Sequence, residues 1–258
     1  MILFNTANLV GRVTGYRFSL AQWGEQEKKT IAATDEAEFA AICRDIRQAG
    51  YVGVELWVAH CHPSAVDVEG ARRRRRIAED HGLRIVALAG GYTEGNLRMA
   101  EALGAESING GLWGTDLPGV LSRLPTSNVA YNYENHPETT PQEILDRIGG
   151  DERIGIALDT GWLGISATVD PASFIRTLGR RIRHVHLKDV AARGSHRTVP
   201  LGSGAVGIPL VLETLQEVGY RGHLSWEDEP EDRNPLDIAA EMRGYIESLA
   251  PWAAGPSR

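Results

Sequence analysis

The stretch around which the chain is organised reads Arg183-His184-Val185-His186-Leu187-Lys188-Asp189. It is a short β-rich run, and successive side chains of a strand point to opposite faces. His184, His186 and Lys188 therefore share one face. Burying unpaired polar groups costs about 1–3 kcal/mol each, so this face is not plain hydrophobic core. The pattern predicts a buried strand that ends in groups suited to binding a cation.

On both sides of this stretch, apolar β-rich runs alternate with longer segments of helical periodicity. Such alternation is typical of a parallel sheet with crossover helices. Helical spacing is clearest over residues 36–48 and 70–81. Eight strands are expected, at residues 2–5, 52–57, 84–89, 107–110, 128–134, 154–159, 182–188 and 222–227.

The number of strand and helix pairs indicates the fold class. A chain of 258 residues is close to the roughly 250 residues of a typical (β/α)8 barrel. We therefore predict an α/β protein in which residues 1–258 form a single (β/α)8 TIM-barrel domain. A doubly wound open sheet is the alternative, but no glycine-rich dinucleotide fingerprint follows an early strand. The polar segment 11–34 is expected to be a long first βα loop that could act as a lid.

Three helix starts support this assignment independently of periodicity. Thr140 is followed by Pro141 and, three residues on, by Glu143, which is the pattern of a capping box with proline at the first helical position. The pairs at 170–171 and 234–235 repeat a capping residue followed by proline. We expect a helix to begin at each of these three points.

Composition excludes several classes of function. Hydrophobic residues make up 42% and charged residues 24%, and no apolar run reaches the roughly 18 residues of a membrane span. No basic leader with a cleavage site opens the chain, and Cys43 and Cys61 give no disulfide framework, so a cytoplasmic location is expected. A net charge of −7 argues against nucleic acid as a partner. The arginine run at 72–76 is interpreted as the solvated face of a helix.

The chemistry is indicated by the residues at which the later strands end. In a barrel the carboxyl ends of the strands meet on one rim, where barrel enzymes place their active sites. Glu134, Asp159, His186 and Glu227 each lie at or beside such an end. Several carboxylates packed together repel one another unless a cation neutralises them. We therefore predict that these four side chains bind one divalent metal ion.

The donor set also favours certain metals. Three carboxylates with one imidazole suit Mn²⁺, Mg²⁺, Co²⁺ or Fe²⁺ better than a thiolate-rich zinc site does. Mn²⁺ is the first choice, and Zn²⁺ remains an alternative.

Four stretches carry a resemblance to a known family: residues 158–161, 184–189 and 202–204, and the last strand, which ends in Glu227. In these and over essentially its whole length the chain resembles the xylose-isomerase-like TIM barrel superfamily, which includes inosose dehydratases and ketose 3-epimerases. The resemblance implies a small sugar or keto-sugar as substrate, the same four metal ligands, and a homo-oligomer. In the epimerases it also implies Glu134 and Glu227 as the acid/base pair. One departure is Trp162, where those members commonly carry a histidine.

A second, local resemblance rests on residues 134–137 together with 159–162. They are similar to the large subunits of C-glycoside deglycosidases and related enzymes that cleave 3-keto-glycosides by β-elimination. This resemblance implies that His136 is the catalytic base. It also implies that a small β-subunit is the partner, in place of a homo-oligomer.

Both resemblances imply proton abstraction next to a carbonyl through a metal-stabilised enediolate, with Glu134, Glu227 or His136 as the base. Return of the proton gives isomerisation or epimerisation. The alternative is a lyase, which removes a β-substituent from a 3-keto-glycoside or dehydrates an inosose. A non-catalytic sugar-binding protein ranks lower. The superfamily's DNA-repair endonucleases rank lower still, because that branch uses a histidine-rich trinuclear zinc cluster and the acidic balance of this chain opposes DNA binding.

Further side chains near the strand ends are expected to contact the substrate. Lys188 or His184 could donate a hydrogen bond to the developing oxyanion. Tryptophan faces can pack against a sugar ring. The expected contacts are Trp57, Trp113 and Trp162, with His60 and His62 after the second strand.

Overall fold

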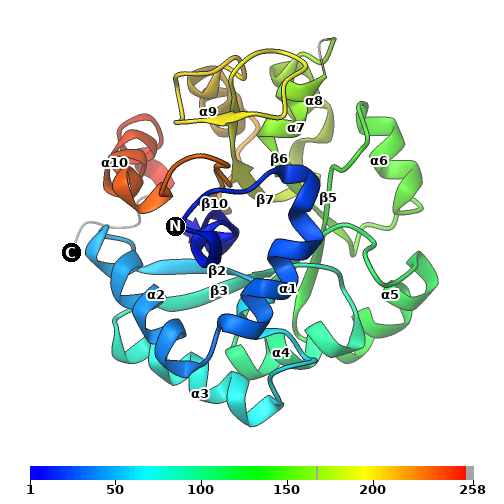
Figure 1. Ribbon diagram of the computed structural model, residues 1–258. Helices are drawn as coiled ribbons and strands as arrows, with labels where there is room; N and C mark the ends of the chain where they lie inside the picture. Colours follow the sequence, from blue (N-terminus) through cyan, green and yellow to red (C-terminus); the bar gives the residue numbers. More distant parts are fainter. Residues whose placement is uncertain (167, 254–258) are drawn as a thin grey trace.

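The computed structural model describes residues 1–166 and 168–253, and within them eight parallel strands close into a barrel surrounded by helices (Figure 1). Each strand pairs with its neighbours along the chain, and the first pairs with the last. The prediction of a (β/α)8 barrel is confirmed. The strands are β1 (Ile2–Asn5), β2 (Gly53–Trp57), β3 (Arg84–Ala89), β4 (Ser107–Gly110), β5 (Ala130–Glu134), β6 (Gly155–Asp159), β7 (Ile182–Leu187) and β10 (His223–Trp226).

The helices that follow the strands begin where local sequence chemistry satisfies their first backbone N–H groups. Thr140 and Glu143 form the predicted capping box, and Asp170 caps the helix after it. Asn234 caps a short 3₁₀ turn that precedes the last α-helix. The outer helices are α2 (Glu36–Gln48), α3 (Val68–Asp80), α4 (Glu94–Leu103), α5 (Leu117–Arg123), α6 (Pro141–Arg147), α8 (Pro171–Leu178), α9 (Ile208–Glu217) and α10 (Ala239–Leu249).

The segment 11–34 is not the continuous loop expected from the sequence. It contains two 3₁₀ turns and then the helix α1 (Trp23–Ala33). Its sequence hid this helix because the side chains that α1 buries are the polar Gln26 and Thr30 rather than an apolar stripe. A role as a lid stays a prediction.

Alternation along the strands places polar side chains inside the barrel, where bulky apolar side chains are more common. Outward-facing side chains such as Leu56, Val185 and Leu187 are buried in the hydrophobic core beneath the helices. The intervening residues, such as Glu55 and His184, meet across the barrel through hydrogen bonds. The apolar core therefore lies between strands and helices, and the barrel itself holds polar side chains.

A small antiparallel pair, β8 (Asp189–Val190) and β9 (Thr198–Val199), follows β7. The buried carboxylate of Asp189 fixes the ends of this excursion. It accepts backbone N–H groups from Val190, Gly202, Gly204 and Val206 at 3.0, 2.9, 3.0 and 3.1 Å. A Cβ on Gly204 would lie 2.3 Å from Asp189 Oδ1, so the turn requires glycine there.

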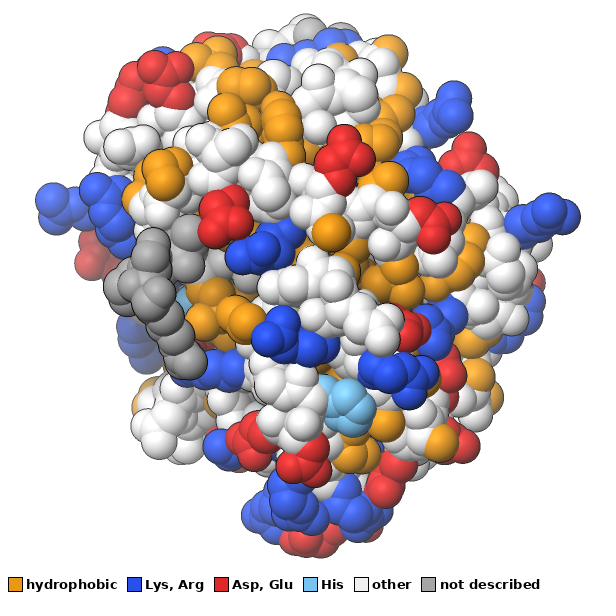
Figure 2. All heavy atoms as spheres, turned by 90° about the vertical axis from the view of Figure 1, so that its left-hand side faces the viewer, with side chains coloured by type: hydrophobic (Ala, Val, Ile, Leu, Met, Phe, Trp, Pro, Cys, Tyr) orange, Lys and Arg blue, Asp and Glu red, His pale blue; other side chains and the backbone are white. Residues whose placement is uncertain are grey.

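Charged side chains of both signs are distributed over the part of the outer surface shown in Figure 2. On the face in Figure 2, basic and acidic side chains are interspersed without a continuous patch of either sign. Arg72, Arg75 and Arg98 pair with nearby glutamates on α3 and α4. None of the helices within the described ranges is long and apolar enough to cross a membrane.

Candidate active site

The four predicted metal ligands lie at the carboxyl ends of neighbouring strands. Glu134 ends β5, Asp159 ends β6, His186 is on β7 and Glu227 directly follows β10. All four side chains are buried, with at most 5% of each residue exposed. Because adjacent parallel strands run in register, their last residues are brought to one end of the barrel.

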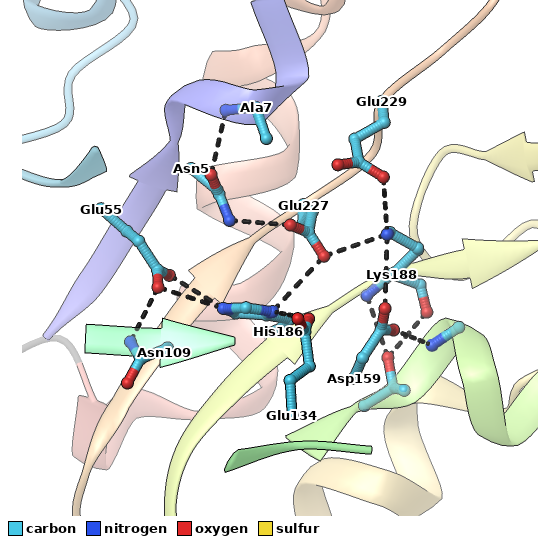
Figure 3. A network of polar contacts seen from close by, with 12 residues as sticks. Asn5, Ala7, Glu55, Asn109, Glu134, Asp159, His186, Lys188, Glu227 and Glu229 are labelled. Carbon is cyan, nitrogen blue, oxygen red and sulfur yellow. Dashed lines mark hydrogen bonds and ion pairs between the residues drawn. The ribbon is translucent and has the colours of Figure 1, made fainter. Parts of the chain in front are cut away.

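Three of these ligands face one another closely. His186 Nδ1 lies 2.6 Å from Glu134 Oε1 and 3.5 Å from Glu227 Oε2 (Figure 3). Glu134, His186 and Glu227 can offer one ligand atom each within 4.8 Å of one another. Asp159 belongs to an adjoining group with Glu134 and His136 that meets the same limit. Glu134 therefore joins two groups that together contain all four predicted ligands.

His186 is held by a residue that the sequence analysis did not single out. Its Nε2 lies 3.1 Å from the carboxylate of Glu55, which comes from β2, the third strand from β7 around the barrel. Glu55 also accepts from Asn109 Nδ2 at 2.7 Å and contacts His184 Nε2 at 2.8 Å. Glu55, Asn109, His184 and the Nε2 side of His186 form what we call the inner cluster.

The inner cluster decides which nitrogen of His186 is available. Because Nε2–H donates to Glu55, Nδ1 is the nitrogen that faces Glu134 and Glu227, and a cation bound there would take the place of the proton on Nδ1. A histidine ligand is commonly oriented in this way by a carboxylate on its other nitrogen. Asn132 Nδ2 donates to Asn109 Oδ1 at 2.8 Å and so extends the support.

Negative charge is in excess on the other side of His186. Lys188 Nζ lies 3.3 Å from Asp159 Oδ2, 3.0 Å from Glu227 Oε2 and 2.7 Å from Glu229 Oε2. We call Glu134, Asp159, Lys188, Glu227 and Glu229 the cavity cluster (Figure 3). It contains four carboxylates and one ammonium group.

Burial, with a smaller contribution from Glu229 and Glu134, changes the acidity of Glu227. Burial raises the pKa of Glu227 to about 8, although Lys188 and His186 act in the opposite direction. Burial alone would also raise the pKa of Glu134, but His136 and His186 lower it. Of Glu134 and Glu227, only Glu227 therefore has its pKa raised by burial in spite of its positively charged neighbours.

The residues present fit a divalent cation. Asn5 Nδ2 donates to Glu227 Oε1 at 2.8 Å, whereas the buried Oε2 has the Lys188 ammonium at 3.0 Å but no hydrogen bond of regular geometry within the described part of the chain. A carboxylate-rich set with one imidazole is a donor set for Mn²⁺, Mg²⁺ or a related ion.

Asp159 has two separate tasks. Its Oδ1 accepts the N–H groups of Gly161 and Trp162 at 2.6 and 3.3 Å and caps the short helix α7 (Thr160–Ile165). Its Oδ2 faces Lys188 and lies 3.1 Å from His136 Nε2. The motif after β6 therefore fixes the direction of the carboxylate, and leaves one oxygen for the site.

A cavity of about 800 Å³ opens above the cavity cluster. Glu134, His136, His186, Lys188, Glu227 and Glu229 line its polar part. Its walls are aromatic, and the His136 ring lies 4.4 Å from that of Trp162 between centroids. The tryptophans that line the cavity are Trp23, Trp57, Trp113 and Trp162.

The remaining predicted contact residues divide into two groups. His62 lines the cavity, and so do Trp113 and Trp162. His60 is buried, with Nδ1 3.0 Å from Thr6 Oγ1, and His184 is bound to Glu55. Neither His60 nor His184 is among the cavity-lining residues of the described chain. The structure thus places these two histidines in supporting positions rather than at the cavity surface.

The fold and the site together define a class of protein: a (β/α)8 barrel with carboxylates and a histidine gathered below a cavity at the carboxyl ends of its strands. The chain belongs to the xylose isomerase-like TIM barrel family, whose model matches residues 96–249.

Similar proteins are found both by sequence and by structure. The chain is 28% identical over 275 residues to the rhizopine catabolism protein MocC of Rhizobium meliloti, covering 81% of this chain and 80% of that protein. It is 29% identical over 150 residues to an inosose dehydratase of Geobacillus thermodenitrificans, a match that spans 50% of each chain.

Among solved structures, L-ribulose 3-epimerase matches with a TM-score of 0.69 at 20% identity, covering 86% of this chain and 92% of that chain. D-psicose 3-epimerase matches with a TM-score of 0.67 at 17% identity, covering 83% and 94%. At these identities the two structures show a shared fold.

Proposed function

We propose that this chain is a divalent-metal-dependent enzyme that isomerises or epimerises a ketose or keto-sugar. The observation that carries the proposal is the convergence of Glu134, His186 and Glu227, buried and within 4.8 Å of one another, below the cavity. The family, and the epimerases that share its fold, support an enzyme acting on sugars.

The cation would be held by Glu134, Asp159, His186 and Glu227. When bound, it would polarise the substrate carbonyl and make the C–H group on the adjacent carbon more acidic. We propose Mn²⁺, with Mg²⁺, Co²⁺, Fe²⁺ and Zn²⁺ as the alternatives.

The protein groups would move the proton and position the sugar. Glu134 and Glu227 form the acid/base pair, because both line the cavity and both come from fixed strand ends. Asp159, Glu227 and Glu229 raise the pKa of Lys188 well above its usual value despite its burial, so it remains a hydrogen-bond donor for the developing oxyanion. Trp113 and Trp162 provide faces for the sugar ring.

The test is an activity screen of the purified chain with Mn²⁺ on free ketoses, inososes and 3-keto-glycosides in D₂O. We expect a ketose product that carries deuterium at the carbon next to the carbonyl. Removal of the metal with EDTA should abolish the reaction, and added Mn²⁺ should restore it. Full activity after exhaustive chelation would contradict the proposal.

A second candidate function is β-elimination, by dehydration of an inosose or cleavage of a 3-keto-glycoside. Two observations favour it: the similarity to proteins named inosose dehydratases, and the position of His136 at the cavity beside Trp162. In this case His136 is the base. An unsaturated product or a released aglycone in the same screen would identify the lyase.

Assembly and location are part of the same proposal. We propose a cytoplasmic homo-oligomer, with a small β-subunit as the alternative partner if the chain is a deglycosidase. Copurification from the native host followed by mass determination separates these two assemblies. A stable metal-free protein that binds sugars without turnover would instead indicate a binding protein.

A further inference from the structure

Glu229 is a cavity residue to which none of the predicted roles applies. Its Oε2 lies 2.7 Å from Lys188 Nζ, closer than the carboxylates of Asp159 and Glu227 (Figure 3). Glu229 and Lys188 both line the cavity, with 14% and 10% of their side chains exposed. Glu229 is therefore the nearest counter-charge of Lys188.

The backbone at Glu229 is held in an unfavourable conformation. Its φ is +50°, a left-handed value that costs a residue with a side chain free energy that glycine avoids. The buried amide of Asn8 fixes this turn: Oδ1 accepts the N–H groups of Asp228 and Glu229 at 2.5 and 3.3 Å, and Nδ2 donates to Trp226 O at 3.1 Å. Strain of this kind persists where surrounding contacts impose it, often at functional sites.

Occupancy of the metal site changes which partners Lys188 keeps. A cation bound by Asp159 and Glu227 would use the same oxygens that now face Lys188, and its positive charge would repel the ammonium group. Glu229 belongs to neither of the two ligand groups that include Glu134. It is thus the carboxylate left to hold Lys188 when the cation binds.

We propose that Glu229 is a positioning residue that keeps the Lys188 ammonium at the substrate side of the cavity and out of competition with the metal. The proposal rests on the metal site of the proposed function. Without Glu229, Lys188 keeps only its contacts with Asp159 and Glu227, and it then opposes metal binding.

The test is a double-mutant cycle on Mn²⁺ affinity, measured by calorimetry on the purified chain without substrate. Glu229→Gln is expected to weaken Mn²⁺ binding about tenfold, because Lys188 then competes for the ligands. In a Lys188→Met background the same change is expected to have less than about a third of that effect. Asp232→Asn removes a charge from the same loop away from Lys188, and serves as the matched control with unchanged affinity.

Two further variants separate the carboxylate from the fold. Glu229→Gly relieves the left-handed backbone, so it should melt at the same or a higher temperature while weakening Mn²⁺ binding as Glu229→Gln does. Glu229→Asp keeps the charge and should recover part of the affinity.

The possible failures are distinguishable. An equal effect of Glu229→Gln in both backgrounds, or none in either, would overturn the positioning role while leaving the metal site intact. Absence of Mn²⁺ binding in the wild-type chain would overturn the proposed function and this inference with it.

Discussion

The inner cluster and the cavity cluster lie on opposite sides of one histidine ring and differ in how their charges are met. In the inner cluster a single carboxylate, Glu55, receives donors on both oxygens from Asn109, His184 and His186. In the cavity cluster four carboxylates share Lys188 and the Nδ1 side of His186. A satisfied buried network supplies rigidity. A network with excess negative charge beside a cavity is suited to a cation and a polar ligand.

The largest expected effect comes from removing a charge of the cavity cluster. Glu227→Gln keeps an oxygen that can accept the hydrogen bond from Asn5, but it removes a proposed metal ligand and a member of the proposed acid/base pair. Turnover should fall at least about 1,000-fold, within the range of lost general acid/base catalysis. Mn²⁺ affinity should fall as well. Assay and calorimetry check both, and wild-type turnover in the variant would contradict the site.

Next in size is His136→Ala, which separates the two proposed reactions. His136 contacts Asp159 but is one-fifth exposed, so its removal should leave Mn²⁺ bound. If the chain is a lyase, turnover should fall about 100-fold or more because the base is lost. Full activity on the true substrate would rule out His136 as the base.

The inner cluster is broken by Glu55→Gln. A glutamine amide can donate to His186 Nε2 and so shift the ring proton to Nδ1, the nitrogen that faces Glu134. Mn²⁺ affinity should fall about 10–100-fold, and ¹⁵N spectra of labelled histidines should report the changed tautomer. His184→Gln, which leaves the Glu55–His186 contact, is the control and should bind Mn²⁺ nearly as well as the wild type. An unchanged affinity in Glu55→Gln would show that the inner cluster does not support the site.

The smallest effect concerns His60, a buried histidine outside both clusters. Burial lowers the pKa of His60 from 6.5 to about 3. Below pH 6.5 the unfolded chain takes up a proton here that the folded chain refuses, so stability falls as the pH drops from 6.5 toward 3. At pH 5 this residue should account for a loss of about 2 kcal/mol relative to pH 7.

Urea unfolding of the metal-free chain and of His60→Asn at both pH values measures this difference. The variant should lose less stability between pH 7 and pH 5 than the wild type. Equal losses would mean that His60 is protonated in the folded chain.

Much of the fold could be predicted because local chemistry repeats in each βα unit. All eight barrel strands lie within two residues of their expected bounds, and Thr140 and Asp170 cap helices as their sequences indicate. The helix α1 was missed because its buried face is polar, so periodicity gave no signal.

The candidate site was predictable where ligands end strands, and not where contacts cross the barrel. Glu134, Asp159, His186 and Glu227 could be grouped because parallel strand ends meet on one rim. The pairing of Glu55 with His186 joins residues 131 positions apart, which spacing cannot reveal. The position of Glu55 within the apolar strand β2 could have indicated a polar partner, since a buried charge requires one. The position of the Glu229 side chain depends on a left-handed backbone conformation at this residue. Glycine is the residue that usually indicates such a conformation, so a glutamate at this position gave no signal of it.

The anchoring of the excursion after β7 by Asp189 bears on how this barrel can change over evolution. Both ends of residues 190–206 are tied to one buried carboxylate, whereas the tip between them contributes His196 and Thr198 to the cavity wall. Insertions or replacements at the tip can therefore change the shape of the cavity wall without displacing Lys188, which immediately precedes Asp189.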